Sequence, residues 1–224
     1  MIKNSLVVVT VSALICGAGL QASAQHRHPV PVAPADAKPP AAQQLPASPQ
    51  GSPQSTESAA QKYFGDVELL NQDGVKLRFY SDLLKGRTVV IIPFFTTCTN
   101  ICPPMNATME RIQDALGDRL GKQVFLISIS VDPATDTPQR LKAYAAKFHA
   151  KPGWSFITGS KENVDWALHK LGQYVEDKNS HTSIMIIGNE ATGLWKKAFA
   201  LSAAGELVKI IEGVADDKGE KASN

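Results

Sequence analysis

The chain has 224 residues, of which 43% are hydrophobic, and its formal net charge at pH 7 is +2. This length predicts one main domain with appendages, and the hydrophobic content suits a packed core but is too low for a protein with many membrane spans. Because no long basic run occurs, the sequence lacks the electrostatic footprint of a nucleic-acid-binding protein, and we expect no nucleic-acid partner.

The N-terminal segment, residues 1–24, has the pattern of a signal peptide. Lys3 supplies a positive charge, residues 6–20 are apolar, and residues 22–24 (Ala-Ser-Ala) offer a cleavage site. The apolar stretch has the length of a signal-peptide core and is short for a membrane span. We therefore expect export to the periplasm and a mature chain that starts near Gln25. The alternative is an uncleaved anchor in the inner membrane, and membrane association is expected only in that case.

Removal of this segment leaves two of the three cysteines. Cys16 departs with the signal peptide, and Ile15 before it is bulkier than the small residue that precedes a lipidated cysteine, so lipidation is not expected. Cys98 and Cys102 remain as one close pair, which cannot form a disulfide framework for an exported fold. The pair is therefore predicted to be redox-active or to bind a metal.

Three further segments are expected after the signal peptide. Residues 25–60 are rich in Pro, Ala and Gln and carry almost no large apolar residue, which predicts a disordered linker. His26 and His28 at its start are interpreted as part of a solvated polar tail, with weak metal binding as the alternative. Residues 61–215 are expected to fold as one domain, and residues 216–224 to form a flexible tail.

The first part of the domain predicts a hairpin and a buried strand. Residues 66–79 contain two short strand-like runs around Asp73-Gly74, a typical hairpin turn. The β-branched and aromatic run at 89–95 predicts a central strand. Pro93 lies within this run and predicts that the hydrogen-bond ladder is interrupted just before the cysteines.

The rest of the domain alternates between helices and strands. Pro103 and Pro104 suit a helix entry, and apolar residues then repeat at helical spacing up to Gly117. The other expected elements are a strand at 124–131, a helix capped by Thr137-Pro138 and running to about 148, a strand at 156–158, a helix at 161–172, strands at 183–187 and 194–201, and a helix at 206–214. This order predicts an α/β, thioredoxin-like fold with an N-terminal β-hairpin extension.

The spacing of Cys98 and Cys102 suggests how they work together. Positions i and i+4 at the opening of a helix lie on one face, so both sulfurs are expected to point at one spot. There they can form a disulfide or share a soft metal ion, Cu(I) or Zn(II). A peroxidase of the peroxiredoxin type is not favoured, because Pro93, Thr97 and Cys98 do not have the required spacing.

A third ligand for such a metal is expected at His181. This residue lies in the loop before the strand at 183–187, which faces the cysteine turn in a thioredoxin-like sheet, although an ordinary loop histidine remains the alternative. His149 and His169 are interpreted as surface or packing residues. Met105 and Met109 could offer thioethers, but their helical spacing favours a core role.

The chain also resembles a known family over residues 64–193. The matching motifs are Asp73-Gly74, Phe95-Thr96-x-Cys98-x-x-x-Cys102-Pro103, Ser130-Val131-Asp132-Pro133, Asp136-Thr137-Pro138, Leu141-Lys142-x-Tyr144, Thr158-Gly159-Ser160 and His181. In this ordered series the chain is similar to the Sco/SenC proteins, thioredoxin-like copper chaperones for cytochrome c oxidase.

The resemblance implies a copper site formed by Cys98, Cys102 and His181, with Cu(I) or also Cu(II). It implies delivery of copper to the dinuclear centre of oxidase subunit II, or reduction of client cysteines as the alternative, so enzymatic activity stays undecided. The implied partners are a copper-accepting oxidase subunit and, in addition, a thioredoxin-like reductant or another copper carrier. Copper transfer by ligand exchange further predicts a shallow, solvent-accessible site.

The chain departs from the family pattern at three places. Thr99-Asn100 replaces the usual Pro-Asp, and Ser180 replaces the usual Asp before the histidine, so two negative charges near the site are lost. Residues 188–193 replace the usual Asp-x-x-Gly turn. Because a carboxylate often orients a metal-binding imidazole, the change at Ser180 predicts looser copper binding or a shift towards redox work.

Overall fold

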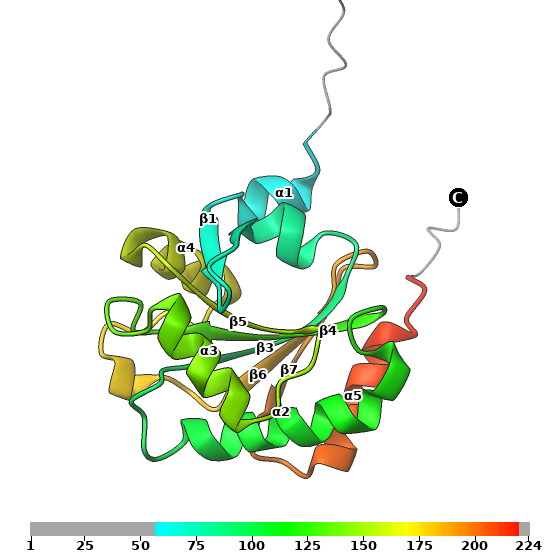
Figure 1. The fold of residues 1–224 in the computed structure, drawn as a ribbon. Helices are drawn as coiled ribbons and strands as arrows, with labels where there is room; N and C mark the ends of the chain where they lie inside the picture. The colour runs from blue at the N-terminus through cyan, green and yellow to red at the C-terminus, as the bar shows by residue number, and fades with distance from the viewer. Residues whose placement is uncertain (1–56, 220–224) are drawn as a thin grey trace, which may run out of the picture. The chain divides into compact units, whose positions relative to one another are not determined.

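The computed structural model describes residues 57–219. The predicted signal peptide, the linker up to residue 56 and the end of the tail from residue 220 lie outside the described residues. In the described part, a mixed sheet has the strand order β2-β1-β5-β4-β3-β6-β7 (Figure 1). Its strands are β1 (Glu68–Asn71), β2 (Lys76–Arg78), β3 (Thr88–Phe94), β4 (Val124–Ser130), β5 (Trp154–Gly159), β6 (Ile184–Asn189) and β7 (Leu194–Phe199).

Helices cover both faces of the sheet (Figure 1). One face packs against α2 (Cys102–Leu116), α3 (Pro138–Lys147) and α5 (Ala204–Ala215). The other packs against α1 (Ala59–Phe64), the π-helix η1 (Phe79–Leu84) and α4 (Lys161–Leu171). Two single 3₁₀ turns, η2 (Gly117–Arg119) and η3 (Lys178–Ser180), lie in the connections. Across residues 57–219, none of the helices is apolar over a length that would cross a membrane.

The central strands supply both hydrophobic cores. Successive side chains of a strand point to opposite faces, so β3 contributes Val90, Ile92 and Phe94 to one core and Val89 and Ile91 to the other. Strands β3, β4 and β5 are parallel, while β6 and β7 are added antiparallel at one side. At the other side β1 pairs antiparallel with β5 and carries β2 as a hairpin. The predicted α/β, thioredoxin-like class with an N-terminal hairpin is confirmed.

Local residue chemistry explains two of the predicted element ends. In the β1–β2 turn, the side-chain oxygen of Asn71 accepts hydrogen bonds from the N–H groups of Asp73 and Val75, each at 2.9 Å, and Gly74 adopts a φ of 75°. At the start of α3, the Thr137 side chain accepts a hydrogen bond from the Arg140 N–H. Both features are short-range, which is why the sequence predicted them.

Other features differ from the sequence-based expectation. The interruption predicted at Pro93 occurs on one side only, because β3 stays paired with β4 through Phe94 while its pairing with β6 ends at Ile91. Besides the two 3₁₀ turns, two elements were not predicted: α1, which begins at Ala59, just before the expected domain start, and η1, which follows the hairpin directly. Both are short and are held by packing on the second core, so neither shows a helical repeat in the sequence.

Candidate metal centre

The two cysteines lie at the junction between β3 and α2. The helix begins at Cys102, so Cys98 lies in the preceding loop, and the expectation that both share one helical face is wrong. The prolines explain the difference: proline is tolerated in the first turn of a helix, but Pro103 would disrupt a helix that started near Cys98. The loop itself brings the residues together, and the Cys102 N–H donates a hydrogen bond to Cys98 Sγ at 3.4 Å.

His181 joins the two cysteines from a distant part of the chain. It follows η3 and precedes β6, and its Nε2 lies 3.1 Å from Cys102 Sγ. The ligand atoms of Cys98, Cys102 and His181 all lie within 4.8 Å of one another. Bonds from a first-row metal ion to sulfur or nitrogen are about 2.0–2.3 Å long, so two ligands of one ion lie up to about 4.6 Å apart. A small side-chain movement therefore lets all three atoms meet one ion.

A backbone carbonyl orients the imidazole. His181 Nδ1 lies 3.3 Å from the carbonyl oxygen of Thr182, and because a carbonyl only accepts, Nδ1 carries the proton. This leaves the lone pair of Nε2 directed at Cys102 and available to a metal. Burial lowers the pKa of His181, and the bond to Thr182 opposes this only in part, so the ring is neutral at pH 7. A carboxylate often orients a metal-binding imidazole, and Ser180 cannot supply one. In this chain the Thr182 carbonyl orients the ring instead.

The two thiols differ in acidity and exposure. Burial acts to raise the pKa of Cys98, but hydrogen bonds from the Cys102 thiol and from the N–H groups of Cys102, Asn100 and Ile101 outweigh it, and the pKa lies below its usual value. Burial raises the pKa of Cys102 far above its usual value, and the neighbouring Cys98 adds to this increase. Cys98 is half-buried, whereas Cys102 is 0% exposed. Cys98 is therefore the more reactive thiol at neutral pH.

The site is less open than the sequence predicted. A pocket of about 200 Å³ leads to it and is lined by Cys98 and His181 together with Phe95, Asn179 and residues of the 97–101 loop. Cys102 does not line this pocket, and His181 is only 6% exposed. The expectation of a shallow, freely accessible site is therefore wrong for two of the three residues. Of the two cysteines, only Cys98 lines the pocket.

A buried carboxylate holds the start of the cysteine loop. Asp136, in the loop before α3, is 0% exposed and accepts hydrogen bonds from the N–H and the hydroxyl of Thr96 and, at 2.6 Å, from the hydroxyl of Ser130. It thereby joins the chain just after β3 to the end of β4. Asp136 belongs to a motif that carried the family resemblance, but the sequence did not show what it binds.

The loop that carries His181 is anchored by Lys178. Its Nζ lies 2.7 Å from a carboxylate oxygen of Asp132 and 5.1 Å from the centre of the Phe95 ring. The Phe95 ring in turn packs edge-on against His181, with ring centres 5.5 Å apart. The ion pair and the ring contacts thus connect the histidine loop to the ends of β3 and β4. No motif in the sequence identified Lys178.

A buried hydrogen-bond chain supports the first turn of α2. The indole N–H of Trp154 donates to Ser128 Oγ, which is bonded to the Asn106 side-chain oxygen, and the Asn106 amide donates to the Cys102 carbonyl. All four residues are buried, so these hydrogen bonds fix the position of Cys102 from the side of the core. The sequence offered no indication of this role for Asn106.

The other candidate residues in the described part of the chain occupy surface and core positions. His149 is exposed and bonded to Glu110 at 2.7 Å, and His169 is exposed and stacks on Tyr174. Met105 and Met109 are both fully buried in the core beneath α2. These positions agree with the surface and core roles that the sequence predicted.

Comparisons with known proteins point to one family. Residues 55–215 match the family model described as SCO1/SenC. A protein of Stutzerimonas stutzeri that is named as copper-binding is 35% identical over 106 residues, which cover 47% of this chain and 50% of the relative. The SCO1 protein homolog of Bacillus subtilis is 39% identical over 118 residues, 51% of this chain and 60% of the relative. The chain thus matches about half of the length of these relatives.

A solved structure agrees with these matches. BsSco, described as a member of the Sco family of cytochrome c oxidase assembly proteins and reported with a disulfide switch, has a TM-score of 0.57 and 27% sequence identity. The likeness covers 68% of this chain and 92% of that structure. It therefore extends over nearly the whole of the solved domain.

Proposed function

The chain belongs to the SCO1/SenC family, and we propose that it is a copper chaperone for a respiratory oxidase. It binds copper through Cys98, Cys102 and His181 and delivers it to a copper-accepting oxidase subunit, with the dinuclear centre of cytochrome c oxidase subunit II as the destination. The observation that carries this proposal is the cluster of the three ligand atoms within 4.8 Å. Copper is the cargo of this activity.

The donor set fits Cu(I) and disfavours a structural zinc site. Thiolate sulfur is a soft ligand that suits Cu(I), and imidazole is compatible with both metals. Structural zinc sites almost always have four protein ligands, and in the part of the chain that the structure describes this cluster contains three. A three-ligand site also leaves room for a fourth ligand from a partner, which transfer requires.

The asymmetry of the cysteines suggests the order of events. Cys98 is the less buried and more acidic of the two thiols, so incoming copper meets its sulfur first. Cys102 loses its proton when the metal binds, because the ion stabilises the thiolate form that burial disfavours. His181 offers Nε2 without losing a proton. In delivery, a partner thiolate replaces Cys98 first, since this sulfur lines the pocket.

Anaerobic titration with Cu(I) tests the proposal. The reduced protein should bind about one Cu(I) per chain. His181→Ala should lower the affinity by more than about tenfold, because loss of a ligand costs at least as much as loss of the groups that orient it. Each Cys→Ser variant should remove high-affinity binding.

A matched control is available at His149. His149→Ala removes an exposed imidazole outside the cluster and should leave the affinity unchanged. An affinity that is equal in His181→Ala and His149→Ala would show that His181 is not a ligand. Zinc binding that exceeds Cu(I) binding in a competition titration would overturn the choice of metal.

A second candidate function is reduction of client disulfides, which the unequal thiols also favour. The Cys98 thiolate attacks one client sulfur, forms a mixed disulfide and releases the other client sulfur as a thiolate. Cys102 then loses its proton and displaces the remaining client sulfur. The client gains two electrons as a dithiol, and the chain retains a Cys98–Cys102 disulfide. A thioredoxin-like reductant has to return these two electrons.

The two functions can be separated experimentally. Copper-free protein should reduce a disulfide-bonded peptide of subunit II in equal stoichiometry, and Cys102→Ser should accumulate the mixed disulfide at Cys98. His181→Ala should keep this reaction while it loses copper affinity. If the reduced protein leaves the peptide oxidised, the second function is excluded.

The proposed place of action is the periplasm. The support is the signal-peptide pattern of residues 1–24, with an inner-membrane anchor as the alternative. Fractionation of expressing cells, with N-terminal sequencing of the product, tests both forms. A mature N-terminus near Gln25 in the periplasmic fraction supports cleavage, whereas an intact N-terminus in the membrane fraction supports the anchor.

A further inference from the structure

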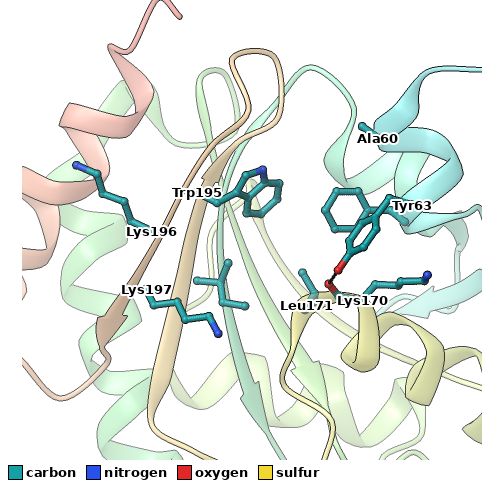
Figure 2. A pocket seen from close by; sticks show the side chains of 9 residues that line it. Ala60, Tyr63, Lys170, Leu171, Trp195, Lys196 and Lys197 are labelled. Carbon is teal, nitrogen blue, oxygen red and sulfur yellow. Dashed lines mark hydrogen bonds between the residues drawn. The ribbon is translucent and has the colours of Figure 1, made fainter.

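A second pocket lies on the face of the sheet that α1 and α4 cover. It has a volume of about 390 Å³ and none of its lining residues belongs to the copper cluster. It is formed by Ala60, Tyr63 and Phe64 of α1, Lys170 and Leu171 of α4, Ile186 of β6, and Trp195, Lys196 and Lys197 of β7 (Figure 2). We call it the aromatic pocket. Its volume is within the range of pockets that bind small organic ligands.

The floor and walls of the aromatic pocket are apolar. Phe64, Ile186 and Leu171 are almost fully buried. The indole of Trp195 and the ring of Phe64 approach to 5.5 Å between centres, and Tyr63 stands edge-on to Phe64. Figure 2 shows Trp195 and Tyr63 on opposite sides of the space between β7 and α1. A flat or chain-like apolar group would find aromatic surface on both sides.

The walls are held in place by the backbone. A Cβ on Gly188 of β6 would lie 2.1 Å from the Trp195 indole, so the indole rests directly on a strand position that has no side chain. On the other side, the Tyr63 hydroxyl donates to the Lys170 carbonyl at 3.1 Å and connects α1 to α4. Because both walls are fixed in this way, the pocket is preformed, which lowers the cost of binding.

The rim is positively charged. The lining contains three lysines and no acidic residue, although the whole chain carries a net charge of only +2. Within residues 57–219, none of these lysines forms an ion pair. Lys170 lies over the rings of Tyr63 and Trp166, and the ammonium group of Lys197 lies beside Gly172, where α4 ends.

The strand places Lys196 and Lys197 differently. Alternate residues of β7 face opposite sides of the sheet. Trp195 packs with the core on the side of α1 and α4, whereas Leu194 and Ala198 pack with the other core. Lys197 is therefore on the same face as Trp195, and in Figure 2 the Lys196 side chain points away from the pocket.

We propose that the aromatic pocket binds an amphiphilic anion, with its apolar body between Trp195 and Tyr63 and its carboxylate or phosphate head at Lys197. An apolar body alone would not require lysines at the rim, and an anion alone would not require aromatic walls. The ligand is either a free amphiphile such as a fatty acid or the headgroup region of an anionic lipid. The site is independent of the copper function proposed above.

Calorimetric titration of the full chain with decanoate, below its micelle concentration, tests this inference. Decanoate should bind at one site, and decyltrimethylammonium, with the same chain length and the opposite charge, should not bind. Lys197→Glu should weaken decanoate binding by about tenfold or more, since it places like charge beside the head group. Lys209→Glu makes the same change of charge on α5, which packs on the other face of the sheet, and should leave binding within about twofold.

Several results would overturn the proposal. One is the absence of decanoate binding, and another is equal binding of the two amphiphiles. Equal weakening by Lys209→Glu and Lys197→Glu would show general charge attraction in place of a site. Sedimentation with phosphatidylglycerol vesicles identifies the source of the ligand: binding that Lys197→Glu reduces indicates a bilayer lipid, and decanoate binding without vesicle binding indicates a free amphiphile. Cu(I) uptake should stay unchanged in both lysine variants.

Discussion

Replacement of Asp136 by alanine should destabilise the fold and loosen the copper site together. The buried carboxylate accepts hydrogen bonds from three donors, the N–H and hydroxyl of Thr96 and the hydroxyl of Ser130. A hydrogen bond to a charged group contributes about 1.5–3 kcal/mol, so three such bonds set an upper range of about 4.5–9 kcal/mol. Removal of the carboxylate also removes the cost of burying its charge, which offsets several kcal/mol. We expect a net loss of about 2–4 kcal/mol in the free energy of unfolding.

Urea denaturation of the reduced, copper-free protein, followed by circular dichroism, measures this loss. Asp73→Ala is the matched control, because Asp73 forms an exposed ion pair with Lys142, and its removal should cost less than about 1 kcal/mol. Cu(I) affinity should fall in Asp136→Ala as well, since Thr96 lies two positions before Cys98. A loss equal to that of the control, with unchanged Cu(I) affinity, would refute the role given to Asp136.

Two further predictions concern the thiols and the histidine loop. Brief treatment of the reduced protein with iodoacetamide at pH 7 should label Cys98 much faster than Cys102, because the pKa of Cys98 is lowered and that of Cys102 is raised. Peptide mass spectra measure the two labelling rates, and equal labelling would contradict this prediction. Lys178→Met should weaken Cu(I) binding several-fold because it frees the loop of His181, and should cost about 1 kcal/mol of stability at pH 7. Burial acts to raise the pKa of Asp132, but the hydrogen bonds from Lys178 and Thr135 and the charge of Lys178 together outweigh it, and the net pKa is lowered. The ion pair therefore stabilises the fold above about pH 4, and the difference from wild type should vanish as the pH falls through the Asp132 pKa. A constant difference down to pH 2 would contradict the ion pair.

The sequence by itself determined the features that depend on near neighbours. The hairpin at Asp73-Gly74 and the cap at Thr137 are set by residues within four positions, so composition and spacing predict them. The strands and longer helices follow from hydrophobic periods of two and 3.6 residues. The candidate residues Cys98, Cys102 and His181 were also identified in the sequence, the first two by spacing and the third by its position before a strand together with the family resemblance.

Only the tertiary structure decided how these residues are arranged. Cys102 and His181 are 79 positions apart, and their 3.1 Å contact exists because the end of β3 and the start of β6 meet beside α2. The burial that separates the acidities of the two thiols depends on every element packed around them. A sequence pattern contains no such information.

The same reason explains the residues that the sequence did not assign. Each of them binds a partner that is distant in the sequence. Asp136 binds Thr96, 40 positions away, and Lys178 binds Asp132, 46 positions away. Asn106 binds Ser128, 22 positions away. The aromatic pocket joins four elements from Ala60 to Lys197. Local periodicity reports which face of an element is apolar, but the identity of its partner across the fold is set by strand order and packing.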